Sequence, residues 1–390
     1  ISTIHSFCLE LLRRNYYRIG LNAGFRVAAE NDITLLRREV LQQYLEDAYE
    51  DNGSGIRELA DAYGGNRDDS GLFDIVLALH DFCRSRRDPW QWLKRSCDAF
   101  DMDEPDKMPF AKYISGGIKN RISLGLTYWQ KALAEGQAVP ESWLATLSSD
   151  IEYLRGMLDA AELADLLQLL EKASFAPLRV PRGDAYADAK EVKALREMGK
   201  KEINALQDKY ANVPWDEQCR RIRALAQPMA AFYRLITGFD QAFEREKQKR
   251  GWIDFGDMEH YTLDLLADES IRQEIGDTYR EILVDEYQDI NEVQEAIIQR
   301  LAAYGNLFVV GDVKQSIYRF RLAEPQLFLA KYNAYGNKSG GRRIDLNNNY
   351  RSEKPVIDGV NFIFRQLMHE DVAELEYDAA AELKTDKIVK

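Results

Sequence analysis

Cysteine is scarce in this sequence, and the four cysteines lie far apart. Cys8, Cys83, Cys97 and Cys219 form no Cys-x-x-Cys pair and have no nearby set of His ligands. A disulfide-rich or zinc-stabilised fold is therefore not expected, and a reducing cytoplasm is. No apolar run approaches the ~20 residues that a bilayer-spanning helix needs, so no membrane contact is expected.

Positive charge is also in deficit. The 390 residues carry 52 Lys and Arg against 65 Asp and Glu, a net charge of −13. A passive nucleic-acid coat, which binds through bulk positive charge, is therefore not expected, although a local DNA groove is compatible with this balance. The length suffices for two or three domains. Because the sequence begins without Met or a secretory signal, we expect a segment cut from a longer protein.

Apolar residues recur at intervals of three and four from about residue 31 to 250, which predicts a nearly all-helical region. Asn31-Asp32 and Ser70-Gly71 supply N-cap chemistry, and helices of about 20 residues or more are expected at 186–211 and 215–250. After this region the runs 281–284 and 307–310, separated by a helix at 291–303, predict a parallel α/β sheet.

The strongest chemical signal follows the first of these strands. The apolar run ends in Asp285 and Glu286, within the sequence Asp-Glu-Tyr-Gln-Asp. At the carboxyl edge of a parallel sheet, Asp285 could hold hydrated Mg²⁺, and Glu286 could activate the water that attacks a γ-phosphate. The alternative is a strand that ends in a solvated acidic turn.

The loop after the second strand carries a second motif. Gly311 allows a tight exit from the strand, and Gln315 is suited to sensing a terminal phosphate. Tyr318 and Phe320 lie among arginines, the combination that stacks single-stranded bases beside charge, although such aromatics can also belong to a core. Arg321 ends this group.

Four further segments carry candidate residues or a distinct charge pattern. A third short run at 343–346, expected to form a strand, precedes Tyr350 and Arg351. These two residues offer a ring face and a guanidinium, or else a capping turn into a helix at 355–368. Near the N-terminus, Thr3, His5 and Phe7 precede an amphipathic helix. The other two segments are 252–258, readable as a helix N-terminus with acidic caps, and 370–382, an acidic tail or helix face.

Taken together, these motifs resemble the superfamily 1 DNA helicases of the UvrD/Rep type. The order is Thr-x-His-x-Phe, Asp-Phe-x-Asp, Asp-Glu-Tyr-Gln-Asp, Gly-Asp-x-x-Gln-Ser-Ile-Tyr and Asn-Tyr-Arg-Ser. Lys314, the sequence Phe320-Arg321-Leu322-Ala323 and residues 285–294 are most similar to the AddA family of ATP-dependent helicase/nucleases. Most of the helicases carry Trp where Phe320 stands and Gly where Leu322 stands.

The resemblance implies a role for each candidate. Asp285 would be the Mg²⁺ carboxylate and Glu286 the general base of an ATP site. Gln315 and Arg321 would sense the γ-phosphate, Arg351 would reach it from the next domain, and Tyr350 would stack on adenine. The implied path for single-stranded DNA is lined by Thr3, His5, Phe7, Tyr318 and Phe320.

The sequence contains no Gly-x-x-x-x-Gly-Lys-Ser/Thr, so the phosphate-binding P-loop of this family is missing, as is its nuclease domain. The expected fold is an α/β, RecA-like NTPase domain without its P-loop, plus a large all-α insertion. The implied segments are 1–30 and 236–338 for the first RecA-like domain, 31–235 for the helical insertion, and 339–390 for the start of a second RecA-like domain. This fragment alone would then be inactive.

The implied function is that of an ATP-dependent 3′→5′ single-stranded DNA translocase. It would be the helicase component of a nuclease complex that processes double-strand DNA ends for recombinational repair, with an AddB-like partner, in a bacterial cytoplasm. One alternative is a non-catalytic, helicase-like scaffold that binds DNA. Another is a Walker-type ATPase that acts on protein, which the stacking aromatics disfavour.

A basic segment at 84–95 lies within the predicted helical insertion. It gathers five basic residues and one acid around Trp90 and Trp92. It could grip DNA phosphates, in which case replacing Arg84, Arg86, Arg87 and Arg95 with Ala would weaken binding and flatten its salt dependence. Alternatively, the tryptophans belong to the core and the charges solvate a helix start.

Overall fold

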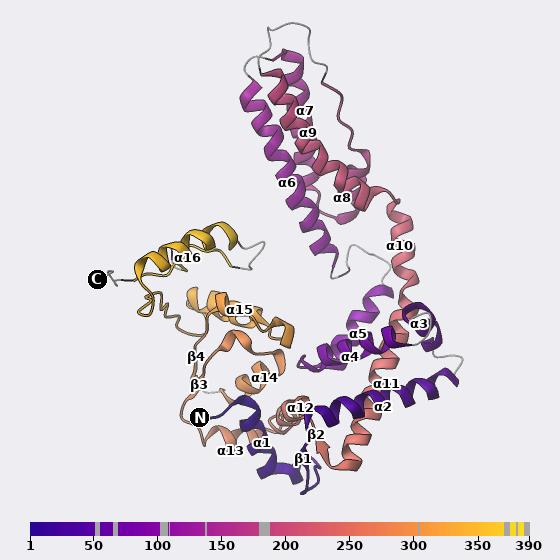
Figure 1. The fold of residues 1–390 in the computed structure, drawn as a ribbon, viewed down its shortest axis with the longest axis vertical. Coiled ribbons are helices and arrows are strands. Elements are labelled where there is room, and N and C mark those ends of the chain that lie inside the picture. The colour runs from indigo at the N-terminus through magenta and orange to yellow at the C-terminus, as the bar shows by residue number, and fades with distance from the viewer. Residues whose placement is uncertain are drawn as a thin grey trace. The chain divides into compact units, whose positions relative to one another are not determined.

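The computed structural model describes residues 1–50, 55–64, 69–101, 108, 110–136, 139–178, 188–302, 305–369, 375–379 and 381–385. These residues form two compact units, Ile1–Arg272 and Gln273–Lys390 (Figure 1). Within this described part, no helix is both long enough and apolar enough to cross a membrane.

The first unit is built mainly from helices. Its N-terminal helix, α1 (Ile4–Asn15), begins at Thr3, whose Oγ1 accepts a hydrogen bond from the backbone N–H of Ser6. The helices that follow are α2 (Glu30–Glu50), α3 (Ile56–Tyr63), α4 (Ser70–Arg84), α5 (Pro89–Asp98), α6 (Ala111–Glu135), α7 (Glu141–Asp159), α8 (Leu163–Lys172), α9 (Ala189–Leu206), α10 (Trp215–Ala224), α11 (Ala226–Arg250) and α12 (Phe255–Leu265).

One apolar core joins α6, α7, α8 and α9, of which α6 packs along both α7 and α9 (Figure 1). Its centre is Trp129, which is fully buried and donates from Nε1 to Asp150 Oδ2 over 3.0 Å. A Cβ atom on Gly199 would lie only 2.3 Å from the Trp129 ring. Glycine at this position therefore lets the two helices approach around the indole.

A second core joins α2, α3, α4, α5 and α11. Leu41, Val76, Leu235 and Phe239 are almost completely buried in it. Strand β1 (Arg26–Val27) comes after α1, and strand β2 (Trp252–Ile253) comes directly after α11. The two strands pair in parallel, and α1 packs against α12.

The second unit contains the predicted parallel pair. Strands β3 (Ile282–Val284) and β4 (Leu307–Val309) pair with Leu283 opposite Phe308. A helix, α14 (Glu292–Leu301), lies between them in sequence. The unit is completed by α15 (Pro325–Gly336), α16 (Lys354–Leu367), and the last part of α13 (Glu269–Gly276), which crosses the unit boundary.

Most of the predicted elements are confirmed. The described part of 31–250 is almost entirely helical, the pair at 281–284 and 307–310 is parallel, and α16 matches the helix at 355–368. The predicted helix at 186–211 is α9 followed by a π-helix over Gln207–Ala211, while the one at 215–250 is divided at Leu225 into α10 and α11.

Four of the predictions drawn from the sequence are wrong. Asn31-Asp32 lies inside α2, because that helix already begins at Glu30. Ser70 is the first residue of α4, and Asp69 is its N-cap residue. No strand forms at 343–346, where Ile344 and Leu346 are exposed. In the described part of 370–382, Tyr377 is buried and donates to Asn361 Oδ1 over 2.7 Å, so this part is not a solvated tail.

Candidate functional site

The two predicted catalytic carboxylates lie directly after β3. Asp285 and Glu286 are both exposed, and Asp285 Oδ1 accepts a hydrogen bond from the Glu286 backbone N–H over 2.9 Å. Glu286 adopts a left-handed backbone with φ of 50°. Such a conformation is uncommon for a residue other than glycine and is found where the surrounding structure enforces it, often at functional sites.

A chain of hydrogen bonds connects Glu286 to Gln315 across the ends of the two strands. Gln288, which is 1% exposed, donates from Nε2 to Glu286 Oε2 over 2.7 Å. Its Oε1 accepts from the backbone N–H of Asp312 over 3.0 Å, and Asp312 Oδ2 accepts from Gln315 Nε2 over 3.0 Å. The structure therefore brings together Glu286 and Gln315, which the sequence places 29 positions apart.

The sequence reasoning gave Gln288 no role. The sequence did contain a signal for such a role, because Gln288 lies within the Asp-Glu-Tyr-Gln-Asp motif and a buried amide needs hydrogen-bond partners. Gly311 explains how the amide fits: a Cβ atom there would lie 2.6 Å from Gln288 Oε1 and 2.9 Å from the Phe328 ring. Glycine at 311 therefore serves close packing, while its φ lies outside the left-handed region, so the exit from β4 does not itself require glycine.

Asp312 is ionised in this arrangement. Burial by itself would raise its pKa, but hydrogen bonds from Lys314 and Gln315, together with the charge of Lys314, lower that pKa below its usual value. Lys314 Nζ lies 2.9 Å from Asp312 Oδ1. Asp289 behaves in the opposite way, because burial and the negative charge of Glu286 raise the pKa of its carboxyl group.

Tyr318, Phe320 and Arg321 form an exposed cluster after β4. Phe320 is 76% exposed, and the guanidinium of Arg321 lies 5.1 Å from the Tyr318 ring centroid and 5.6 Å from that of Phe320. Leu322, where the resembling helicases mostly carry Gly, has φ of 65°. The turn that glycine favours is thus formed here with leucine.

The segment with Tyr350 and Arg351 is a turn rather than a strand end. Asn349 Oδ1 accepts hydrogen bonds from the backbone N–H groups of Arg351 and Ser352 over 2.9 and 2.8 Å. The Tyr350 ring is 77% exposed. The exposed ring face is therefore present, whereas this turn does not cap α16, whose N-cap residue is Glu353 and makes no side-chain capping hydrogen bond.

Thr3, His5 and Phe7 belong to the first unit. Thr3 is exposed, and Phe7 is half-buried. His5 Nε2 lies 3.0 Å from Oε1 of the buried Glu259, and the His5 ring meets the ring of Phe255 edge-on, with centroids 4.9 Å apart. Phe255, 54% exposed on α12, received no role from the sequence, although its Asp-Phe-x-Asp motif belongs to the resemblance and its segment was interpreted as a helix start.

That interpretation of 252–258 is itself confirmed. Asp254 is the N-cap residue of α12, and its Oδ1 accepts from the Asp257 backbone N–H over 2.8 Å. The Asp257 side chain accepts in turn from the Asp254 backbone N–H, which closes a capping box.

The basic segment at 84–95 does not form a single exposed patch. The Arg84 guanidinium pairs with the buried Asp257 over 2.8 Å, and Arg86 packs on the Phe82 ring. Trp90 packs against the second core. Two arginines of the proposed patch, Arg87 and Arg95, remain exposed.

Comparison with known proteins assigns the family. Residues 1–336 match the model of the UvrD/REP helicase N-terminal domain. The chain belongs to the UvrD/REP helicase family. A Geobacillus thermodenitrificans protein, named as the A subunit of an ATP-dependent helicase/nuclease, is 39% identical over 98% of the chain. Proteins of the same name from Bacillus pumilus and Syntrophomonas wolfei are 38% and 36% identical over 98% and 97% of it.

This UvrD/REP chain spans about a third of the length of the curated relatives it matches. Among its described residues, no group of three or more His, Cys, Asp and Glu is placed to hold a metal ion. Mg²⁺ is commonly held by one or two carboxylates, with water and phosphate oxygens as the other ligands. The exposed Asp285 at the strand end suits such a site.

Proposed function

We propose that this chain is part of a longer ATP-dependent helicase that translocates 3′→5′ on single-stranded DNA. Its relatives are named as the A subunit of an ATP-dependent helicase/nuclease, and that name implies a second subunit. The proposed substrates are single-stranded DNA and double-stranded DNA ends, processed for recombinational repair in a bacterial cytoplasm. The proposed partner is an AddB-like protein.

The observation that carries the proposal is the hydrogen-bonded chain from Glu286 through Gln288 and Asp312 to Gln315. A general base such as Glu286 must be held in position beside the nucleotide. An amide that senses the γ-phosphate, such as that of Gln315, must act on the same nucleotide, so a link between the two is expected. Mg²⁺ bound through Asp285 would neutralise phosphate charge and orient the phosphates. Glu286 would accept a proton from the attacking water, and its link to Gln288 would keep its carboxylate oriented.

The remaining candidates divide into two groups. Arg321 and Arg351 are proposed to contact the γ-phosphate and Tyr350 the adenine, for which its exposed ring is suited. Single-stranded DNA is proposed to contact Thr3, His5, Phe7, Tyr318 and Phe320. We add Phe255 to this proposal because its exposed ring lies beside that of His5. Exposed aromatic rings beside charged groups are typical of surfaces on which bases stack.

We also propose that the helical region 31–235 is an insertion between two parts of a RecA-like domain, 1–30 and 236–338. Residues 339–390 would begin a second such domain. The parallel pairing of β3 with β4, joined through α14, supports an α/β core of this kind.

The test is strand separation by the full-length protein. We expect it to hydrolyse ATP in the presence of single-stranded DNA and to unwind duplexes that carry a 3′ single-stranded tail, with little action on those that carry a 5′ tail. Unwinding of 5′-tailed duplexes alone would overturn the polarity. DNA binding without ATP hydrolysis would instead support the non-catalytic scaffold.

A further inference from the structure

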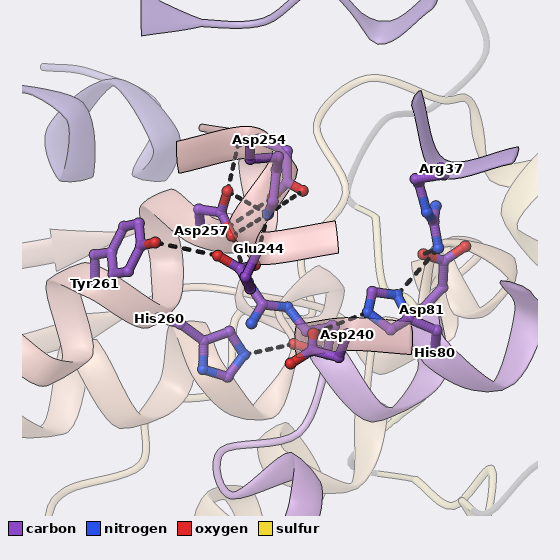
Figure 2. Close-up of polar contacts among 11 residues, drawn as sticks. Arg37, His80, Asp81, Asp240, Glu244, Asp254, Asp257, His260 and Tyr261 are labelled. Atoms are coloured by element: carbon purple, nitrogen blue, oxygen red, sulfur yellow. Dashed lines mark hydrogen bonds and ion pairs between the residues drawn. The ribbon is translucent and has the colours of Figure 1, made fainter. Parts of the chain in front are cut away.

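A lysine is buried among three carboxylates in the first unit. Lys247 of α11 is 1% exposed. Its Nζ atom lies 2.7 Å from Glu244 Oε1, 3.0 Å from Asp254 Oδ2 and 2.6 Å from Asp257 Oδ1. These carboxylates converge in Figure 2, where the Tyr261 hydroxyl also points toward Glu244, to which it donates over 3.2 Å.

Arg84, the last residue of α4, reaches the same cluster. Its Nη2 atom lies 2.8 Å from Asp257 Oδ1. Its backbone carbonyl accepts a hydrogen bond from His260 Nε2 over 2.9 Å. Two helices of the second core, α4 and α11, thus each supply one cation to the start of α12.

The two carboxylates that receive these cations flank Phe255. Asp254 precedes it as the N-cap residue, and Asp257 closes the capping box two positions after it. Asp254 and Asp257 therefore each bind both the Lys247 ammonium group and a backbone N–H at the start of α12. Burial alone would raise the pKa of Asp254, but the charges of Lys247 and Arg84 hold it down to about 2, so this carboxylate stays ionised. Burial and the negative charge of Asp254 raise the pKa of Asp257.

Stability alone does not explain this arrangement. Desolvating several charges is costly, and well-packed apolar side chains often serve stability as well or better. Hydrogen-bonded ion pairs differ from apolar contacts because they are satisfied in only a narrow range of geometries. Here that geometry fixes the first turn of α12, from which the exposed Phe255 ring projects beside His5.

We infer that Lys247 and Arg84 are positioning residues, which hold Phe255 in place to stack on a base of single-stranded DNA. The inference rests on the proposed function, because it assumes that Phe255 contacts DNA. The two cations would join the DNA-contacting end of α12 to the helical region of α4 and α11. Neither cation is proposed to contact the DNA itself.

The experiment uses the full-length protein and the variants Lys247→Met, Lys247→Arg and Phe255→Ala. Arg196→Met is the matched control, because Arg196 is also fully buried and pairs with Asp150 over 2.6 Å, but in the α6–α9 core. Binding of a fluorescein-labelled oligothymidylate is followed by anisotropy. Stacking is followed by the fluorescence of 2-aminopurine in the oligonucleotide, and fold stability by thermal unfolding.

We expect Lys247→Met to weaken binding about 10-fold, the size of one lost base stack, and to reduce 2-aminopurine quenching. Lys247→Arg should restore most of the binding, and Arg196→Met should lower stability without changing affinity. In the Phe255→Ala background, Lys247→Met should have no further effect. If Lys247→Met does not fold, Arg84→Gln takes its place, because the Arg84 side chain is 17% exposed and its loss is milder.

Three results would overturn the inference: unchanged binding by Lys247→Met, an equal loss in Arg196→Met, or additive effects of Lys247→Met and Phe255→Ala. A failure of the proposed function would look different. In that case, the unaltered full-length protein would neither bind the oligonucleotide nor hydrolyse ATP in response to it.

Discussion

The side-chain amide of Gln288 donates to the carboxylate of Glu286 over 2.7 Å, from a position that is almost completely buried. The same amide accepts from the Asp312 backbone in the loop after β4. The orientation of the Glu286 carboxylate therefore depends on how the ends of two strands pack against each other, as well as on its own loop.

The first prediction concerns Glu286 itself. In the full-length protein, Glu286→Gln should lower ATP turnover by about 10²–10⁴-fold, the usual contribution of a general base. Binding of Mg-ATP should be nearly unchanged, because the substitution keeps the size and hydrogen-bonding shape of the side chain. Steady-state hydrolysis and equilibrium nucleotide binding measure the two effects separately. Turnover close to that of the unaltered protein would remove Glu286 from this role.

A second prediction follows from the missing phosphate-binding motif. The 390-residue chain by itself should bind ATP weakly and hydrolyse none, because it has no Gly-x-x-x-x-Gly-Lys-Ser/Thr to hold the triphosphate. Phosphate release measured with the purified chain, with and without single-stranded DNA, checks this. Sustained Mg²⁺-dependent hydrolysis would show that another segment replaces the motif.

A third prediction uses two glycines as a matched pair. In Gly311→Ala the new methyl group would meet Gln288 Oε1 and the Phe328 ring, which should destabilise the fold by about 1–3 kcal/mol. The displaced amide should also lower ATP turnover of the full-length protein by about 10-fold or more. Gly116→Ala is the control, because nothing lies within 4 Å of its added Cβ and the helix should gain up to ~1 kcal/mol. Equal effects of the two substitutions would contradict the prediction.

The fourth prediction concerns what remains of the basic segment. Because Arg84 pairs with Asp257 and Arg86 packs on Phe82, the two arginines of this segment that remain exposed for DNA phosphates are Arg87 and Arg95. Replacing both with Ala should weaken DNA binding by the full-length protein and reduce its salt dependence, by about one unit of slope for each phosphate that is no longer bound. DNA-independent ATP hydrolysis should not change. An unaltered affinity and slope would assign these arginines to surface solvation.

The fifth prediction is a pH dependence that arises from His80. Burial lowers the pKa of His80. The neutral ring accepts from Arg37 at Nδ1 over 3.1 Å and donates from Nε2 to Asp240 Oδ1 over 3.0 Å (Figure 2). The unfolded chain, with a pKa of about 6.5, therefore takes up a proton first, and stability is lost as the pH falls below about 6.5.

Thermal unfolding midpoints of the full-length protein at about pH 7.5 and about pH 5.5 test this prediction. His80→Gln should show a smaller decrease between the two values than the unaltered protein does. An identical decrease in both proteins would mean that other groups account for the acid sensitivity.

Local sequence patterns predicted a good part of this molecule. The helical periodicity, the strands β3 and β4, and the caps at Thr3 and Asp254 all depend on residues close together in the chain, which is why they were recognisable. The run at 343–346 failed because only Ile344 and Leu346 are apolar, and neither finds a buried face.

Long-range contacts were not predictable in the same way. Arg84 and Asp257 are 173 positions apart, and nothing in the surroundings of either residue marks the pair. Lys247 lies in a run of charged residues that looks like a solvated helix face, yet it is buried. Leu322 departs from the residue that its backbone favours, because most of the resembling helicases carry Gly there. The left-handed turn is nevertheless formed with leucine, at a cost of roughly 1–2 kcal/mol.

The close approach of α6 and α9 also limits how this part of the chain can evolve. With the Trp129 ring 2.3 Å from where a Cβ on Gly199 would lie, neither position can change freely by itself. A larger residue at 199 requires a smaller one at 129, and a smaller residue at 129 leaves a cavity and removes the donor that pairs with Asp150. Substitutions at positions 129, 150 and 199 should therefore occur together among relatives, even though these positions are far in sequence from the proposed nucleotide and DNA contacts.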